Sequence, residues 1–218
     1  MDASSQEPPR RRVTERLRKL RFDAGTLCLD LVATVGRRGY VPVERMGDPG
    51  RLDEWCRGVG MSLAEGYDPT VTLQALHELR EAAFDIASSV VDGHRPRPDA
   101  LVLVNRLARP HPPTPRLEWT PDGVRSGGRE QLTVQQLMST IARDLIDLMS
   151  DDERRSRLHA CASEACRMIY LDTAGGRTRK WCSMQRCGNQ AKAASHRSRS
   201  TRAGGPPAVP QAVEPSPR

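Results

Sequence analysis

The apolar residues of the chain recur mostly at the 3.6-residue spacing of an α-helix. The clearest run extends from about Thr70 to Val91, where the apolar positions form one stripe and Gly93 follows the end. A second long run, from Thr133 to Met149, has the same period, and a shorter one covers about residues 98–108. These patterns predict a mainly α-helical fold in which several amphipathic helices share one core.

Two further helices are expected in the first third of the chain. Apolar residues recur at helical spacing from Leu27 to Val35, and Gly36 follows as a C-terminal stop. Asp48-Pro49 has the chemistry of an N-cap followed by proline at the first helical position. The helix that it opens is expected to bury Leu52, Trp55, Cys56 and Val59 and to end near residues 58–60.

One short β-hairpin interrupts the predicted helices. Residues 116–119 and 124–126 flank Thr120-Pro-Asp-Gly123, which has the composition of a tight turn. The fold class expected is a mainly α-helical N-terminal domain with one short β-hairpin, followed by a small module of a β-hairpin plus a helix. The expected boundaries are a frayed tail at 1–20, the helical domain at 21–150, the small module at 155–200 and a Pro-rich disordered tail at 203–218.

Four of the six cysteines fall within 27 residues, and they predict a metal site. They form two pairs with four residues inside each pair, Cys161 with Cys166 and Cys182 with Cys187, separated by a spacer of fifteen residues. Two close pairs on a short spacer suit a tetrahedral Zn²⁺ held by four thiolates. Two disulfides, a redox switch and an iron–sulfur cluster are the alternatives. One structural zinc is the cofactor that we expect, because a module with so few large apolar residues cannot fold on burial alone.

The local structure around the four cysteines can also be predicted. We expect the spacer to form a hairpin, with Met168–Leu171 in a strand and Asp172–Gly176 in its turn. Cysteines five residues apart lie about 140° apart around a regular helix. Cys182 and Cys187 therefore require a turn or an irregular helix start between them, which Gly188 would permit.

Three other metal-capable residues have alternative readings. His159 precedes the first cysteine by two residues and could replace a ligand, although a surface position is favoured. Cys28 and Cys56 lie on apolar helical faces, where buried core thiols are favoured over a redox-sensing pair.

Charge and composition narrow the function classes. Residues 151–202 hold twelve Lys or Arg and five acids, so they carry the whole net charge of +7 of the chain. A basic module beside a neutral body indicates a polyanionic partner for that module. No apolar run is long enough for a signal peptide or a membrane span, so a cytoplasmic protein without membrane contact is expected. No catalytic triad, phosphate-cradling loop or carboxylate pair is recognisable, so no enzymatic activity and no catalytic residue are expected.

Residues 155–200 closely resemble the CGNR zinc finger, a bacterial module named after the tetrapeptide at its last ligand. Besides the four cysteines, the resemblance rests on Tyr170-Leu-Asp172, Arg177, Arg179, Trp181-Cys-Ser-Met184, Cys187-Gly-Asn189, Lys192 and His196-Arg197. The chain has Gln190 where the family has arginine, which removes one phosphate or base contact and leaves the ligands intact.

The preceding helical part resembles the ABATE domain, described as a stress-induced transcription regulator. Leu27-Cys-Leu-Asp30 followed by Thr34, and Leu52 three residues before Trp55, match that family, whereas Ala33 stands where the family has asparagine. The two resemblances together imply a transcription regulator that binds DNA through the finger. They leave open whether the helical domain forms a homodimer or senses a small-molecule effector.

The residues expected to contact nucleic acid surround the last two cysteines. They are Arg177, Arg179, Lys180, Asn189, Gln190, Lys192, His196, Arg197 and Arg199. Basic residues would neutralise phosphates, while Asn and Gln side chains can read base edges. A zinc-dependent protein-interaction adaptor and an RNA-binding factor are the alternative functions, and a solvated charged surface is the structural alternative.

Overall fold

A computed structural model describes residues 13–127, 131–174 and 178–195. The chain divides into two compact units, Met1–Cys182 and Ser183–Arg218. The described residues are mainly helical, and their strands form three two-stranded antiparallel sheets. This confirms the predicted mainly α fold class.

The longest helix of the first unit is α4, Pro69–Asp92. The Asp68 side chain caps its N-terminus by accepting hydrogen bonds from the backbone N–H groups of Thr70 and Val71. The helix ends at Gly93, which adopts the left-handed conformation (φ 71°) that glycine reaches without steric cost. The bounds of α4 confirm the prediction within one residue at each end.

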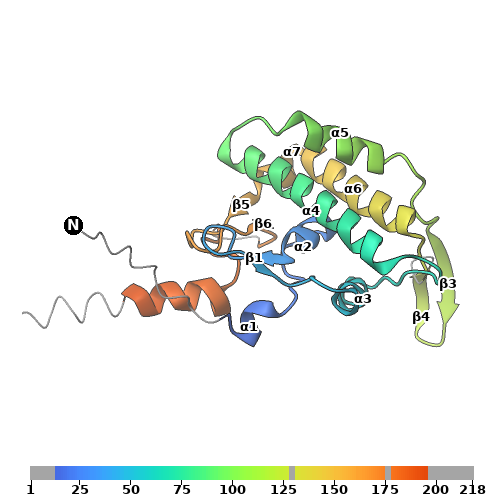
Figure 1. The fold of residues 1–218 in the computed structure, drawn as a ribbon, viewed down its shortest axis with the longest axis horizontal. Helices are drawn as coiled ribbons and strands as arrows, with labels where there is room; N and C mark the ends of the chain where they lie inside the picture. The colour runs from blue at the N-terminus through green and yellow to red at the C-terminus, as the bar shows by residue number, and fades with distance from the viewer. Residues whose placement is uncertain (1–12, 128–130, 175–177, 196–218) are drawn as a thin grey trace, which may run out of the picture. The chain divides into compact units, whose positions relative to one another are not determined.

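Three further helices of the first unit pack against α4: α2 (Leu27–Val32), α5 (Pro98–Leu107) and α6 (Val134–Ser150). Helices α2 and α5 also contact α6. Figure 1 shows α5 and α6 running beside α4. Thr133 and Gln136 form a capping box that fixes the start of α6. The core between these helices is aliphatic: Leu29, Leu76, Leu79, Leu137, Ile141 and Leu145 are all fully buried.

Helix α3, Pro49–Gly58, begins as the sequence predicts. The Asp48 carboxylate accepts a 3.0 Å hydrogen bond from the backbone N–H of Arg51, and Pro49 occupies the first turn. Leu52, Trp55 and Cys56 are buried on one face of the helix, which confirms these three core positions. Val59 is only partly buried, because the helix ends at Gly58 and Val59 lies beyond its last turn.

The remaining elements are short. They are helices α1 (Glu15–Arg18) and α7 (Asp152–Ser156), and the strand pairs β1–β2 (Val35–Gly36 with Val43–Glu44), β3–β4 (Arg116–Thr120 with Gly123–Gly127) and β5–β6 (Leu158–Ala160 with Ile169–Leu171). The β3–β4 pair is the predicted hairpin, closed at Pro121-Asp122. In the second unit a π-helix, η1 (Met184–Gly188), leads into a helix over 189–195.

The helix expected from Leu27 to Val35 is shorter than predicted. It ends at Val32, and Val35 belongs to β1. The Arg45 backbone N–H donates to the Thr34 carbonyl, and its guanidinium donates to the Ala33 carbonyl. Ala33 and Thr34 directly follow the last residue of α2, and their carbonyls accept from Arg45 rather than from the next turn of a longer helix. Tertiary contacts from Arg45 therefore override the helical periodicity at this end.

Buried arginines fasten the short strands to the helices. The Arg80 side chain on α4 is almost fully buried and donates to both carboxylate oxygens of Glu44 on β2, at 2.9 and 2.8 Å. It also donates to the Thr34 hydroxyl at 3.0 Å. A buried charge with these partners has its hydrogen-bonding groups satisfied, which offsets its desolvation.

The two cysteines outside the small module are core residues, as predicted. Cys28 and Cys56 are both buried. Burial raises the pKa of Cys28 well above its ordinary value and raises that of Cys56 to about 12. Protonated, buried thiols of this kind are inert packing groups.

The Asp30 carboxyl makes stability depend on pH. Burial raises its pKa to about 6, although a 2.9 Å hydrogen bond from the Ala24 backbone N–H opposes the shift. A carboxyl whose folded pKa exceeds its unfolded value contributes stability below the unfolded pKa of about 4 and loses it as pH rises through about 6. Asp30→Asn keeps an acceptor for Ala24 but cannot ionise. The variant should therefore gain unfolding free energy relative to wild type between pH 4.5 and 7.5, by at most about 1.4 kcal/mol per pH unit.

Urea unfolding across this pH range measures the difference between the two proteins. Parallel pH profiles for Asp30→Asn and wild type would contradict the assignment of this titration to Asp30.

Candidate metal centre

The first cysteine pair lies in the turn of the β5–β6 hairpin. Strand β5 runs into Cys161, whose backbone N–H donates to the Met168 carbonyl at 2.9 Å and extends the strand pairing by one step. The Cys166 backbone N–H donates to the Ser163 carbonyl at 2.8 Å. Arg167 then adopts the left-handed conformation (φ 51°), which returns the chain to β6. The hairpin therefore holds Cys161 and Cys166 on one tight turn.

This pairing corrects the expected hairpin. The sequence predicts a turn at Asp172–Gly176, between the two cysteine pairs, and residues 175 and 176 of it lie outside the described residues. The structure pairs Ile169–Leu171 with Leu158–Ala160, the strand before Cys161. The reason is that Asp172 uses its hydrogen bonds to close a loop. Its backbone N–H donates to the Arg157 carbonyl, and its carboxylate accepts from the backbone N–H groups of Ala174 and Arg179.

The β5–β6 hairpin packs on the helical domain. Leu158, Met168, Ile169, Tyr170 and Leu171 are all buried, and the strands contact α2 and α4. The Leu171 backbone N–H also donates to the Ala24 carbonyl at 2.8 Å. The first half of the small module thus shares the core of the helical domain.

Two glycines mark how closely the hairpin and the helical domain approach. A Cβ on Gly25 would lie 2.9 Å from the Leu171 Cβ, and a Cβ on Gly39 would lie 1.7 Å from the Glu164 carbonyl oxygen. Contacts between heavy atoms this short do not occur, so only glycine fits at either position.

The second cysteine pair is built on an irregular helix start. Cys182 lies in a bend, and its backbone N–H points at the Cys161 sulfur with an N···Sγ distance of 3.5 Å. Ser183 is extended, and the π-helix η1 then places Cys187, whose backbone N–H donates to the Ser183 carbonyl. The π-turn and the extended Ser183 confirm the predicted irregularity between the two cysteines.

The four sulfurs form a group with the dimensions of a zinc site. The Sγ atoms of Cys161, Cys166, Cys182 and Cys187 all lie within 4.8 Å of one another, and those of Cys166 and Cys182 are 3.7 Å apart. A tetrahedral zinc with bonds of about 2.3 Å to sulfur requires edges of about 3.8 Å, whereas a disulfide bond would be about 2.05 Å. All six cysteines lie in the described part of the chain, and none forms a disulfide.

The donor set itself is suited to one structural zinc. Three of the four cysteines are buried and Cys166 is partly exposed. Four cysteine ligands would fill a tetrahedral zinc and leave no open position for a substrate. His159 lies outside this group; its ring centroid is 6.0 Å from that of Tyr170 on the neighbouring strand. The four cysteines are therefore positioned to bind one metal ion without it.

Asp172 and Tyr170 hold the segment between the two cysteine pairs. The Arg179 Nε donates to the Asp172 carboxylate at 3.0 Å, its Nη2 donates to the Leu171 carbonyl at 2.9 Å, and the guanidinium lies over the Tyr170 ring. Tyr170 in turn donates its hydroxyl hydrogen to the Arg179 carbonyl. The hydrogen bond from the Arg179 backbone N–H is the largest cause that lowers the pKa of Asp172, and the Ala174 backbone N–H and the Arg179 guanidinium lower it further. Asp172 is thus a turn residue, as the sequence indicates.

The expected nucleic-acid contacts fall into three groups. Arg177, His196, Arg197 and Arg199 lie outside the described residues. Lys180, Asn189, Gln190 and Lys192 are exposed. Arg179 is half-buried and its guanidinium is engaged by Asp172 and Leu171, which gives this residue a structural role that the sequence did not indicate.

Sequence reasoning also missed Arg21 altogether. Its side chain is buried beside the cysteines and donates to the Cys182 sulfur, with an Nη1···Sγ distance of 3.3 Å. The two residues are 161 positions apart, so no local motif could have revealed the contact.

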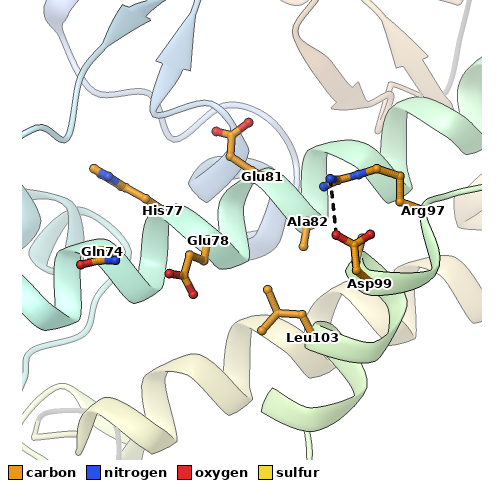
Figure 2. A pocket seen from close by; sticks show the side chains of 9 residues that line it. Gln74, His77, Glu78, Glu81, Ala82, Arg97, Asp99 and Leu103 are labelled. Carbon is orange, nitrogen blue, oxygen red and sulfur yellow. Dashed lines mark ion pairs between the residues drawn. The ribbon is translucent and has the colours of Figure 1, made fainter.

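The helical domain also carries a groove of about 440 Å³ between α4 and α5, with several charged side chains among its lining residues. Figure 2 shows His77 and Glu78 from α4 and the ion-paired Arg97 and Asp99 at the start of α5 around it. His77 makes a 2.7 Å hydrogen bond through Nε2 to the Met46 carbonyl. A smaller hollow of about 210 Å³ has mostly apolar walls from α4, α5 and α6.

Comparison with protein families matches both parts of the chain. Residues 25–152 match the ABATE family, described as "putative stress-induced transcription regulator", and residues 157–200 match the CGNR zinc finger. Neither is an enzyme family. No curated protein shows a significant sequence match to the chain. None of the described helices is long and apolar enough to cross a membrane.

The close approach at Gly39 can be tested by adding one methyl group. Gly39→Ala should reduce the unfolding free energy by about 1–3 kcal/mol, because the new Cβ would collide with backbone at Glu164 and force the loop and the hairpin apart. Denaturant unfolding of the zinc-loaded protein measures the effect. Gly47→Ala is the control, since its Cβ would meet no backbone atom and only the Glu44 Cγ, at 3.2 Å. Equal stability of the two variants would contradict the packing described here.

The metal content provides a direct test of the four-cysteine site. Purified protein should contain one zinc per chain, and Cys187→Ser should lose it, because three thiolates and a hydroxyl hold zinc far less tightly. Elemental analysis after gel filtration measures the content. Cys56→Ser removes an equally buried sulfur outside the group and should retain zinc; loss of zinc from both variants would speak against a specific four-cysteine site.

Proposed function

We propose, from the premise that the chain belongs to the ABATE family and carries a CGNR zinc finger, that it is a DNA-binding transcription regulator. In this proposal the zinc is structural and the finger contacts DNA. The helical domain senses a signal or mediates dimerisation. The zinc would catalyse no reaction, because cysteine fills all four positions around the metal.

The observation that carries the proposal is the way the chain leaves the last cysteine. Cys187 and Gly188 are buried, whereas Asn189 and Gln190, the next two residues, are exposed at the start of the helix over 189–195. A helix held at its N-terminus by a metal site can enter a DNA groove with its first residues on the base edges. Asn and Gln amides match the paired donor and acceptor of adenine in the major groove.

Basic side chains near this helix supply the sequence-independent part of the binding. Lys192 is exposed and lies three residues after Asn189, so the two side chains share one face of the helix. Lys180 is exposed in the segment before Cys182. Phosphate contacts from such residues fix the position of a protein on the duplex, while Asn189 and Gln190 would read its sequence.

A second feature supports a sensing role for the helical domain. The groove between α4 and α5 brings carboxylate, imidazole and guanidinium groups together on a lining that is mostly apolar. A small polar effector could bind such a groove, which lies on the ABATE domain.

Salt dependence should distinguish DNA binding from the alternatives. For a finger that neutralises about four to six phosphates, log affinity should fall with log salt at a slope of about −4 to −5. Lys192→Gln should reduce the magnitude of this slope by about 1 and weaken binding to all duplexes alike. Asn189→Ala should instead reduce discrimination between duplexes, by about 1–3 kcal/mol at one base pair. Fluorescence anisotropy with duplex DNA and RNA probes measures both effects.

Arg125→Gln on the β3–β4 hairpin is the control, because it removes an exposed arginine outside the finger. It should leave the slope unchanged. Tighter binding to RNA than to duplex DNA would favour the RNA-binding alternative, and salt-insensitive or absent binding of both would favour a protein-interaction adaptor.

A further inference from the structure

Arg21 reaches the cysteine group from the other end of the chain. It lies outside both segments matched by the families, 25–152 and 157–200. Its residue exposure is only 4%, yet it carries a full positive charge. Its Nη1 donates to the Cys182 sulfur at 3.3 Å. An arginine buried at this depth requires partners for its charge and for its hydrogens.

Asp23 fixes the direction in which the guanidinium points. The Arg21 Nε and Nη2 each donate to a different carboxylate oxygen of Asp23, both at 2.8 Å. This two-pronged geometry orients the planar group. The remaining edge of the guanidinium, with Nη1, is thereby directed at Cys182. The ion pair with Asp23 thus fixes the Arg21 side chain in the orientation that contacts the Cys182 sulfur.

The charge of the metal site explains what this contact can do. Four thiolates around one Zn²⁺ leave a formal charge of −2 that the surroundings must stabilise. A cationic hydrogen bond to one sulfur draws electron density away from that sulfur. Groups that bond to metal ligands in this manner tune the affinity of the site for its metal.

We propose that Arg21 is a positioning residue of the zinc centre: it orients the Cys182 sulfur, offsets part of the negative charge of the four-sulfur site and slows release of the metal. This role is additional to the proposed DNA binding and does not depend on it. It also gives the helical domain a direct part in retaining the zinc, because Arg21 precedes Ala24, whose carbonyl accepts from Leu171 on the hairpin.

The alternative is that Arg21 only forms a buried ion pair that stabilises the fold. Arg80 offers a matched comparison, since it is buried to the same degree and also donates to both oxygens of a carboxylate, that of Glu44. The Arg80 side chain donates to Glu44, Glu81 and Thr34, and none of these is a cysteine of the metal site. Arg80→Met should therefore destabilise the fold without a specific effect on the metal.

The test compares zinc affinity in the full-length chain. Arg21→Met removes every donor, and competition against a chromophoric chelator should show about a 10- to 100-fold loss of zinc affinity with faster release. Arg21→Lys keeps the charge but lacks the planar fork, and should lie between wild type and Arg21→Met. Arg80→Met should bind zinc with wild-type affinity.

Cobalt substitution provides a readout that a purely structural role would not change. A hydrogen bond to sulfur lowers the energy of its electrons, so its loss should move the sulfur-to-cobalt charge-transfer band of Arg21→Met to longer wavelength. Wild-type affinity and an unshifted band in Arg21→Met would overturn the proposal. So would an equal loss of zinc affinity in Arg80→Met, because it would reduce the effect to general destabilisation. If Arg21→Met does not fold, Arg21→Lys and Asp23→Asn carry the same spectroscopic test, with unshifted bands in both overturning the proposal.

Discussion

The confinement of four cysteine sulfurs within 4.8 Å of one another constrains everything around them. Four thiolates at this separation repel one another unless a cation lies between them, so the ionised form of this group requires a bound metal. A different backbone conformation places each of these cysteines. Strand pairing places Cys161, the left-handed Arg167 closes the turn after Cys166, and the π-turn after Ser183 places Cys187. The irregular backbone of this region is a consequence of the geometry that the metal demands.

Metal alone does not account for the fold of the small module. Its hairpin buries Ile169, Tyr170 and Leu171, and the helices that cover them belong to the ABATE domain. A segment this small has too little apolar surface to form its own core. The glycines at 25 and 39 allow the two backbones to approach, which only side-chain-free positions permit. The ABATE domain therefore supplies the burial and the zinc supplies the cross-link, and the hairpin depends on both.

The sequence reveals the parts of this arrangement that are determined locally. Cysteine spacing identifies the four sulfurs, and the Asp48-Pro49 cap places the start of α3, because each signal lies within a few residues. The strand partner of Ile169 was predicted wrongly, since three-residue strands show no alternation that distinguishes one partner from another. The end of α2 and the contact of Arg21 with Cys182 depend on side chains distant in sequence, and a single sequence carries no signal for such contacts.

The distance of each residue from the metal site would determine its part in the proposed DNA contact. The metal holds the helix over 189–195 only at its first residues, because Cys187 is the last ligand. Positional precision falls with distance from a fixed point, and base readout requires hydrogen bonds aligned within a few tenths of an ångström. Specificity would therefore reside in Asn189 and Gln190, beside the anchor, while basic residues further along would contribute affinity through less directional phosphate contacts. In the proposed contact Gln190, in place of the family's arginine, would change which base edge is matched, because an amide pairs with adenine where a guanidinium pairs with guanine.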